Sequence, residues 1–126
     1  MEHPSRENGP YRTEIAAHRG GGDLWPENSP TAFRNVTRLP VDYVEFDVHP
    51  TSDGHLVVHH DAMLGRVTDG EGAILDKTWD EVSRSIIKGT DGERPPLLEE
   101  VIDIFAPTDI KLRLEFKNNA DQDLYV

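Results

Sequence analysis

The stretches Tyr43–Val48 (YVEFDV) and Ile110–Lys117 (IKLRLEFK) decide the fold, because apolar and charged residues alternate in both. Successive side chains of a β-strand point to opposite faces, so each stretch predicts a strand with one apolar and one charged face. Charge on the inner face of a parallel sheet is costly unless it is paired or binds something. The pattern fits a (β/α)8 barrel, in which the carboxyl ends of the strands carry the chemistry.

The rest of the chain alternates between further predicted strands and helices. Ser29 suits a helix N-cap, Pro30 the first helical position, and Pro40 a helix end. The expected elements are strands at 13–17, 56–60 and 110–116 besides 43–48, and helices at 30–39, 80–88 and 97–105. In this order the strand at 56–60 is the third of the barrel and the one at 110–116 the fourth. Strands that alternate with helices predict a parallel α/β architecture.

The composition is that of a globular domain. The 126 residues include 36% hydrophobic and 29% charged residues, no cysteine, and a net charge of −11. This charge repels nucleic acid and attracts divalent cations. No apolar run approaches the roughly 18–20 residues of a membrane span, and residues 1–12, predicted to be a flexible arm, lack the apolar region of a signal peptide. We therefore expect a cytoplasmic protein without a nucleic-acid partner or a transmembrane segment.

A glycine-rich loop after the first strand carries the first candidate site residues, His18 and Arg19. A histidine can give or take a proton near neutral pH. An arginine can direct two donors onto a phosphate, and the glycines at 20–22 let the backbone approach a ligand closely. The alternative interpretation of the same residues is a flexible surface turn.

Carboxylates at alternate positions of the two decisive strands are the second candidate. Glu45 and Asp47 lie on the same face of one strand, and Glu115 and Lys117 on the same face of the other. Carboxylates that share a face repel one another unless a cation lies between them, and oxygen ligands suit Mg²⁺ or Ca²⁺. The alternatives are a solvated strand face and an internal salt bridge.

The sequence His59-His60-Asp61 follows the predicted strand 56–60 and offers a second proton-transfer group. Either histidine could be catalytic. His60 has the parity of Leu56 and Val58, and Asp61 beside it is a plausible orienting partner. A structural histidine is the alternative, and zinc is disfavoured because no cysteine accompanies the pair.

Short motifs in a fixed order resemble the glycerophosphodiester phosphodiesterase family over about residues 15–117. The motifs are Ala17-His18-Arg19-Gly20, Pro26-Glu27-Asn28-Ser29 with Ala32-Phe33, Glu45-Phe46-Asp47-Val48, Thr51-x-Asp53-Gly54, Val57-Val58-His59-His60-Asp61, Arg66-x-Thr68-x-Gly70, Pro96-Leu97-Leu98-Glu99-Glu100-Val101 and Glu115-Phe116-Lys117. The chain departs from the family pattern at Val67 and at Pro95–Leu98. Neither departure touches a proton donor or a metal ligand.

The resemblance implies the metal-dependent cleavage of a glycerophosphodiester to glycerol 3-phosphate and an alcohol, in glycerol and lipid metabolism. It assigns the general acid and base to His18 and His60, in an order left open. The same carry-over makes Glu45, Asp47 and Glu115 ligands of Ca²⁺ or Mg²⁺, and makes Arg19 and Lys117 phosphate contacts. Glu27 and Asn28 would shape the loop beside the site, and residues 61–95 would be the insertion that family members carry on the barrel.

The length of the chain limits these expectations. A (β/α)8 barrel takes about 250 residues, so residues 13–126 would form only its first half. Open strand edges invite pairing. The chain would then be a piece of a longer protein, a half-barrel that pairs with another copy or with another chain, or a short protein without useful activity. The alternative function is a truncated, inactive module that binds metal or glycerophosphate. A sphingomyelinase D-type phospholipase is disfavoured, because those proteins are usually secreted and carry disulfides.

Overall fold

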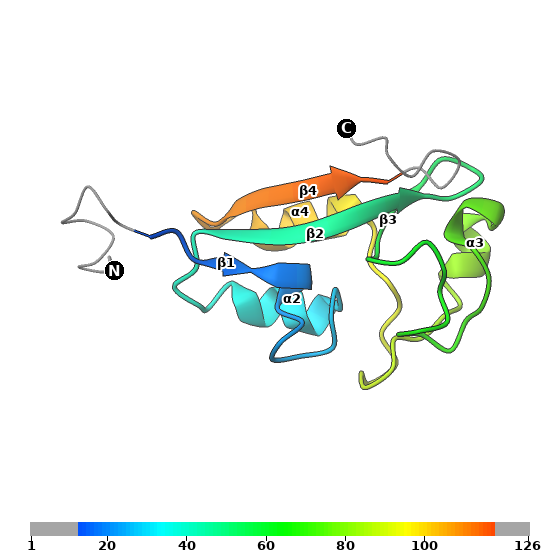
Figure 1. The fold of residues 1–126 in the computed structure, drawn as a ribbon, viewed down its shortest axis with the longest axis horizontal. Helices are drawn as coiled ribbons and strands as arrows, with labels where there is room; N and C mark the ends of the chain where they lie inside the picture. The colour runs from blue at the N-terminus through cyan, green and yellow to red at the C-terminus, as the bar shows by residue number, and fades with distance from the viewer. Residues whose placement is uncertain (1–12, 118–126) are drawn as a thin grey trace.

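The computed structural model describes residues 13–117, which form one sheet covered on one face by helices (Figure 1). The sheet is four-stranded, with the order β1-β2-β3 and with β4 paired to β2. Its strands are β1 (Ala16–Ala17), β2 (Tyr43–Pro50), β3 (Leu56–Val58) and β4 (Lys111–Phe116). The helices are α2 (Pro30–Val36), α3 (Trp79–Val82) and α4 (Leu98–Phe105), with 3-10 turns η1 (His18–Gly20) and η2 (Ile74–Asp76). The predicted arm at residues 1–12 lies outside the described residues.

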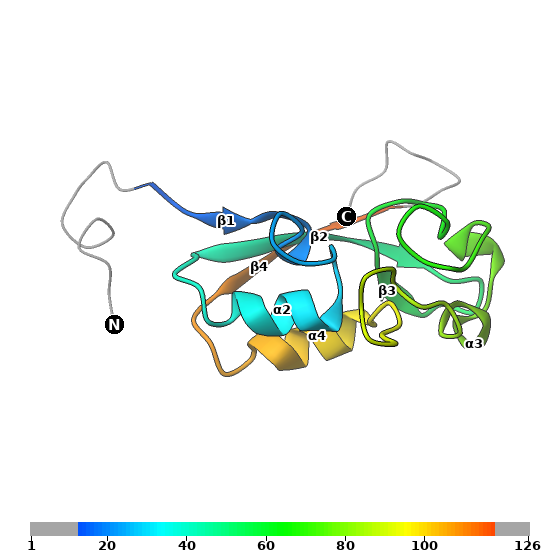
Figure 2. The ribbon, with the colours of Figure 1, turned by 90° about the horizontal axis from the view of Figure 1, so that it is seen from below.

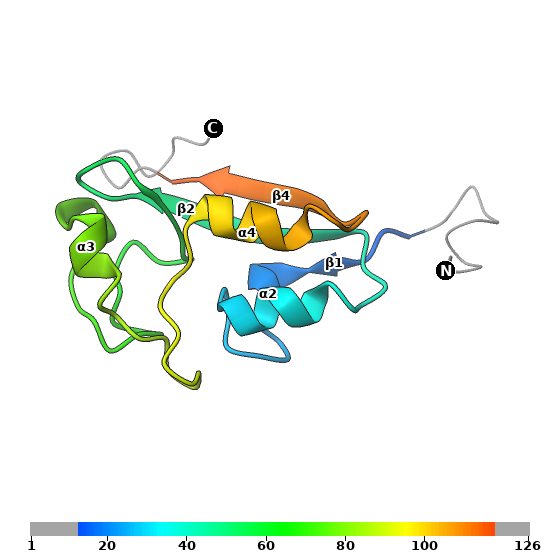
Figure 3. The same ribbon diagram turned by 180° about the vertical axis from the view of Figure 1, so that it is seen from behind.

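The strands β1, β2 and β4 are parallel, as the sequence predicts. In the β2–β4 register, Glu45 is opposite Arg113 and Asp47 is opposite Glu115. The two connecting helices, α2 and α4, lie side by side on the same face of this sheet (Figures 2 and 3). The charged residues of β2 and β4 therefore face away from the helices.

The prediction that residues 56–60 form the third strand of the barrel is wrong. The strand β3 ends at Val58 and pairs with β2 in the antiparallel direction. A turn from Thr51 to His55 causes the reversal: Thr51 and His55 share a backbone hydrogen bond of 2.8 Å, and Gly54 has a φ of 86°. Two residues past the end of this hairpin, the chain reaches His60 beside β2.

The predicted helices are also longer than the observed ones. Instead of running through 80–88, α3 ends at Val82, because the amide of Ile86 donates to Asp69 at 2.7 Å and Ile87 forms an isolated bridge with Thr68. The helix at 30–39 ends at Val36 and continues as a turn. The helix at 97–105 is confirmed, starting one residue later than expected.

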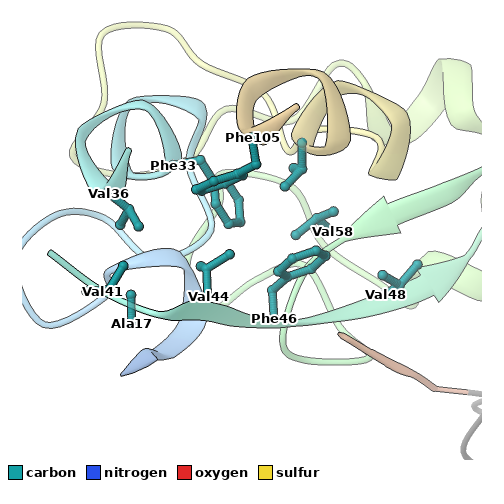
Figure 4. Close-up of a cluster of buried hydrophobic side chains, with 10 residues drawn as sticks. Ala17, Phe33, Val36, Val41, Val44, Phe46, Val48, Val58 and Phe105 are labelled. Carbon is teal, nitrogen blue, oxygen red and sulfur yellow. The ribbon is translucent and has the colours of Figure 1, made fainter. Parts of the chain in front are cut away.

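The core lies between β2 and the helices α2 and α4 (Figure 4). Phe33 of α2 meets Phe46 of β2 and Phe105 of α4 edge to face, with ring centroids 5.5 and 6.0 Å apart. Val44 and Val48 point to the same side and are fully buried. This core fixes the direction of the opposite, charged face of β2.

The segment at residues 61–95 packs on a smaller apolar cluster of its own, made of Val57, Leu64, Ile74 and Val82. Glu93 ties this segment to the start of α2. Its carboxylate accepts hydrogen bonds from the amide and hydroxyl of Thr31 at 3.1 and 2.7 Å and pairs with Arg34 at 2.9 Å. The assignment of residues 61–95 as a family insertion stays a prediction.

Candidate active site

The loop after β1 presents His18 and Arg19 because its glycines allow a left-handed backbone. Arg19, Gly20 and Gly21 have φ values of 46°, 60° and 87°. A Cβ added at Gly20 would lie 2.6 Å from Cε1 of the buried Phe33, so this position accepts no side chain. The backbone of Gly20 therefore packs on the core, while His18 and Arg19 remain exposed.

His18 lies against the charged face of β2. Its Nδ1 is 2.5 Å from Oε1 of Glu45, while its side chain remains 69% exposed. A carboxylate at this distance fixes the orientation of the ring and leaves Nε2 available for a reacting group. The pair places a candidate proton donor or acceptor at the mouth of the half-barrel.

His60 faces the same region from the other side, because the β2–β3 hairpin brings the chain back along β2. Its Nε2 is 3.7 Å from Oδ2 of Asp47, and its Nδ1 is 2.8 Å from Oδ1 of Asp61. His49, which is buried, lies with its Nε2 3.0 Å from the backbone carbonyl oxygen of the partly exposed His60.

His59 has a different role from its neighbour. It is 2% exposed, its Nε2 lies 3.2 Å from the carbonyl of Met63, and burial lowers its pKa. The structure thus gives the two neighbouring histidines different surroundings. His60 turns to the charged face and His59 holds the loop that follows.

A cleft of about 280 Å³ brings these groups together, and it is lined by His18, Arg19, Glu45, Phe46, Asp47, His60, Arg113, Glu115 and Lys117. All seven residues predicted as site residues are among them. Burial raises the pKa of Asp47, and the nearby charges of Lys117 and His60 offset part of that rise. The roles of the seven residues stay predictions, because adjacency alone does not distinguish an acid from a ligand.

Two arginines near the cleft were not predicted as site residues. Arg113 lines it, with its guanidinium 3.7 Å above the ring of Tyr43. Its position on the same strand face as Glu115 was the available sequence signal. Arg66 lies between Asp61 and Glu27 and hydrogen-bonds both. Its membership of an ordered motif was the only sequence signal, and that signal gives no role.

The three predicted ligand carboxylates offer the right donor atoms for a divalent cation, but their side chains are not arranged around one point. Glu45, Asp47 and Glu115 line one cleft and offer only oxygen, the donor that Mg²⁺ and Ca²⁺ prefer. Within residues 13–117, however, no three acidic or histidine side chains are gathered closely enough to hold an ion as they stand. Glu45 is instead engaged by His18, so rotation of carboxylate side chains would have to accompany binding.

Comparison with known proteins gives a consistent family. A family model described as the glycerophosphoryl diester phosphodiesterase family matches residues 18–124. The glycerophosphodiester phosphodiesterase of Caldanaerobacter subterraneus subsp. tengcongensis is 39% identical over 112 residues, which cover 85% of this chain and 46% of that protein.

Solved structures agree in fold. An Oleispira antarctica phosphodiesterase, solved in complex with the product sn-glycerol-3-phosphate, is 32% identical with a TM-score of 0.77 over 83% of this chain and 44% of that one. A glycerophosphodiester phosphodiesterase from Agrobacterium tumefaciens is 30% identical with a TM-score of 0.77 over 84% of this chain and 48% of that one. These likenesses confirm the predicted (β/α)8-barrel class, of which the chain holds only a part.

The chain spans about half the length of the curated relatives it matches, 46% for the first of them. Across residues 13–117, no helix combines the length and the apolar character needed to cross a bilayer.

Proposed function

Because the chain belongs to the glycerophosphoryl diester phosphodiesterase family, we propose that it carries the catalytic residues for hydrolysis of a glycerophosphodiester to glycerol 3-phosphate and an alcohol. The observation that carries the proposal is that His18, His60, three carboxylates and three positively charged side chains line the same cleft. The product bound in the Oleispira antarctica relative supports a small glycerophosphate-containing substrate.

The two histidines would divide the proton transfers. One takes the proton of the attacking hydroxyl or water as its oxygen bonds to phosphorus. The other protonates the alkoxide as the phosphorus–oxygen ester bond breaks. His18 is oriented by Glu45 at 2.5 Å, and His60 by Asp61 at 2.8 Å. Each ring therefore has one nitrogen held by a carboxylate and one that is left for the reaction.

The positively charged side chains of the cleft would hold the phosphate. Arg19 comes from the glycine-rich loop, and Lys117 directly follows β4, so the two approach from different elements. A guanidinium can bind two phosphate oxygens at once, and an ammonium acts as a point charge. Positive charge at the phosphate offsets the net charge of −11 that would otherwise repel it.

Glu45, Asp47 and Glu115 would hold a divalent cation, Ca²⁺ or Mg²⁺. The bound cation would supply Lewis-acid polarisation of phosphate oxygens and charge neutralisation. The support is an oxygen donor set on neighbouring strands, in which Asp47 and Glu115 are opposite each other in the β2–β4 register. Asp47, whose pKa is raised by burial, would gain most from a neighbouring cation.

A second candidate function is an inactive module that binds metal or glycerophosphate without turnover. The observation that favours it is that the chain matches only 46% of its curated relative. Self-association of the half-barrel stays a prediction, which analytical ultracentrifugation would test. A cytoplasmic location also stays a prediction, which cell fractionation would test.

The test is release of glycerol 3-phosphate from glycerophosphocholine with Ca²⁺ or Mg²⁺, on this chain and on any longer encoded form. We expect His18→Ala and His60→Ala to abolish release. His55→Ala is the matched control, because His55 is exposed and pairs with Asp53 rather than lining the cleft. Release that survives both cleft variants refutes the proposal, and metal binding by calorimetry without release favours the inactive module.

A further inference from the structure

Arg66 is outside the cleft lining but connects the two loops that carry the cleft histidines. Its Nε donates to Oδ2 of Asp61 at 2.7 Å and its Nη2 to Oδ1 at 3.2 Å. Its Nη1 and Nη2 donate to the two carboxylate oxygens of Glu27 at 3.2 and 2.6 Å. We propose that Arg66 is a positioning residue that holds the His60 ring through Asp61, an inference that rests on the function proposed above.

The Asp61 end of this contact acts on His60. Oδ1 of Asp61 lies 2.8 Å from Nδ1 of His60 and also accepts from Arg66, whose Nε holds the other oxygen. Two hydrogen bonds from one planar guanidinium stop the carboxylate from rotating about its own bond. A fixed Asp61 keeps the proton of the neutral imidazole on Nδ1 and leaves Nε2 toward Asp47 and the cleft.

The Glu27 end acts on the opposite loop. Glu27 follows the glycine-rich loop, and its side chain is only 13% exposed. It accepts from both terminal nitrogens of Arg66 and, at 3.4 Å, from Nη1 of Arg19. The contact thus joins the His60 side of the cleft to the loop that carries the predicted phosphate contact.

The geometry distinguishes this contact from an ordinary surface ion pair. An isolated exposed pair holds one geometry weakly and contributes little to stability. Although its side chain is 47% exposed, Arg66 uses three nitrogens on two carboxylates, and one of these, that of Glu27, is 39 residues away from Arg66 in the sequence. Lysine has one point of contact and could not bridge both carboxylates in the same way.

The test is the tautomer of the His60 ring in the full 126-residue chain. ¹⁵N-detected imidazole spectra, recorded at one alkaline pH, compare wild type with Arg66→Gln, Arg66→Lys and Arg84→Gln. Arg84 is the matched control, because its exposed side chain, just after α3, pairs with the exposed side chain of Asp80. We expect the Nδ1–H form of His60 to dominate in wild type and in Arg84→Gln, to lose at least half its population in Arg66→Gln, and to be intermediate in Arg66→Lys.

Kinetics give a second, separate readout in whichever form hydrolyses glycerophosphocholine. We expect Arg66→Gln to lower kcat about 10–100-fold, the range found for partners that orient the ligands of a metal site, with KM changed less than threefold and partial recovery in Arg66→Lys. A His60 tautomer and a kcat that match those of Arg84→Gln overturn the inference, even if the thermal midpoint falls.

The outcomes separate this inference from the function proposed above. A tautomer shift in Arg66→Gln without hydrolysis in any form supports the positioning role while the proposed hydrolysis fails. Should Arg66→Gln not fold, Arg66→Lys decides, and an unchanged tautomer there overturns the inference.

Discussion

The replacement Gly20→Ala tests how the core positions the glycine-rich loop that carries His18 and Arg19. Gly20 has a φ of 60°, and a Cβ there would lie 2.6 and 2.7 Å from Cε1 and Cζ of Phe33. Phe33 is fully buried and cannot swing away, because Phe46 and Phe105 enclose its ring. The added methyl must therefore displace either the core or the loop.

The magnitude follows from a matched variant, Gly54→Ala. Gly54 has a φ of 86°, and an added Cβ there meets nothing within 4 Å. Both variants carry the left-handed backbone penalty of about 1–2 kcal/mol and the same change in the unfolded chain. The difference between them isolates the clash, which we expect to cost about 1–3 kcal/mol more in Gly20→Ala.

Urea unfolding followed by circular dichroism measures this difference. With a slope of about 1–3 kcal/mol per M, the midpoint of Gly20→Ala should lie about 1 M below that of Gly54→Ala. The double variant Gly20→Ala with Phe33→Leu should cost less than the sum of its single changes, because the shorter side chain makes room. Equal midpoints for the two glycine variants, or strict additivity with Phe33→Leu, would refute the reasoning.

Three further predictions concern charged groups. Hydrogen bonds from Arg66 and His60 hold the pKa of Asp61 below its usual range. The ionised Asp61 carboxylate therefore stabilises the fold fully above about pH 4, and this contribution declines as the pH falls. In urea unfolding, the free energy of unfolding should decrease less between pH 7 and pH 3 in Asp61→Asn than in the wild type. Glu93→Gln should cost about 1 kcal/mol by weakening the contact with the start of α2, whereas Glu99→Gln, on the exposed side of α4, should cost little in the same assay. Glu45→Gln with Asp47→Asn should weaken Ca²⁺ binding at least tenfold by calorimetry, and an unchanged affinity would remove these residues from the proposed metal site.

Much of the site could be predicted because its signals are local. A period of two along β2 and β4 determines which side chains face the cleft, and the structure keeps that alternation. The parity argument likewise favoured His60 over His59, although β3 ends before either residue. Parity persisted because the chain continues extended past Val58, where the amide of His59 bonds to the carbonyl of Asp47 at 3.0 Å.

The errors and omissions come from contacts between distant segments. The direction of β3 depends on how the Thr51–His55 turn closes, and a short apolar run reads alike in either direction. Helix α3 stops early because Ile86 and Ile87 pair with Asp69 and Thr68. The role of Arg66 depends on Glu27, 39 residues away, and no periodic pattern joins residues at such a separation.

The charges on the inner face of the sheet differ from one level of the strands to the next, and only one of two adjacent levels would favour the proposed cation. Glu45 is opposite Arg113 in the β2–β4 register, so at this level a negative charge meets a positive one. One step along the strands, toward their carboxyl ends, Asp47 is opposite Glu115, and two negative charges meet. Like charges on adjacent strands are destabilising unless a counter-charge lies between them. Burial raises the pKa of Asp47, and the negative charge of Glu115 adds to that rise. His60 and Lys117 supply part of that counter-charge, and a divalent cation would supply the rest at the end of the strands where a barrel carries its chemistry.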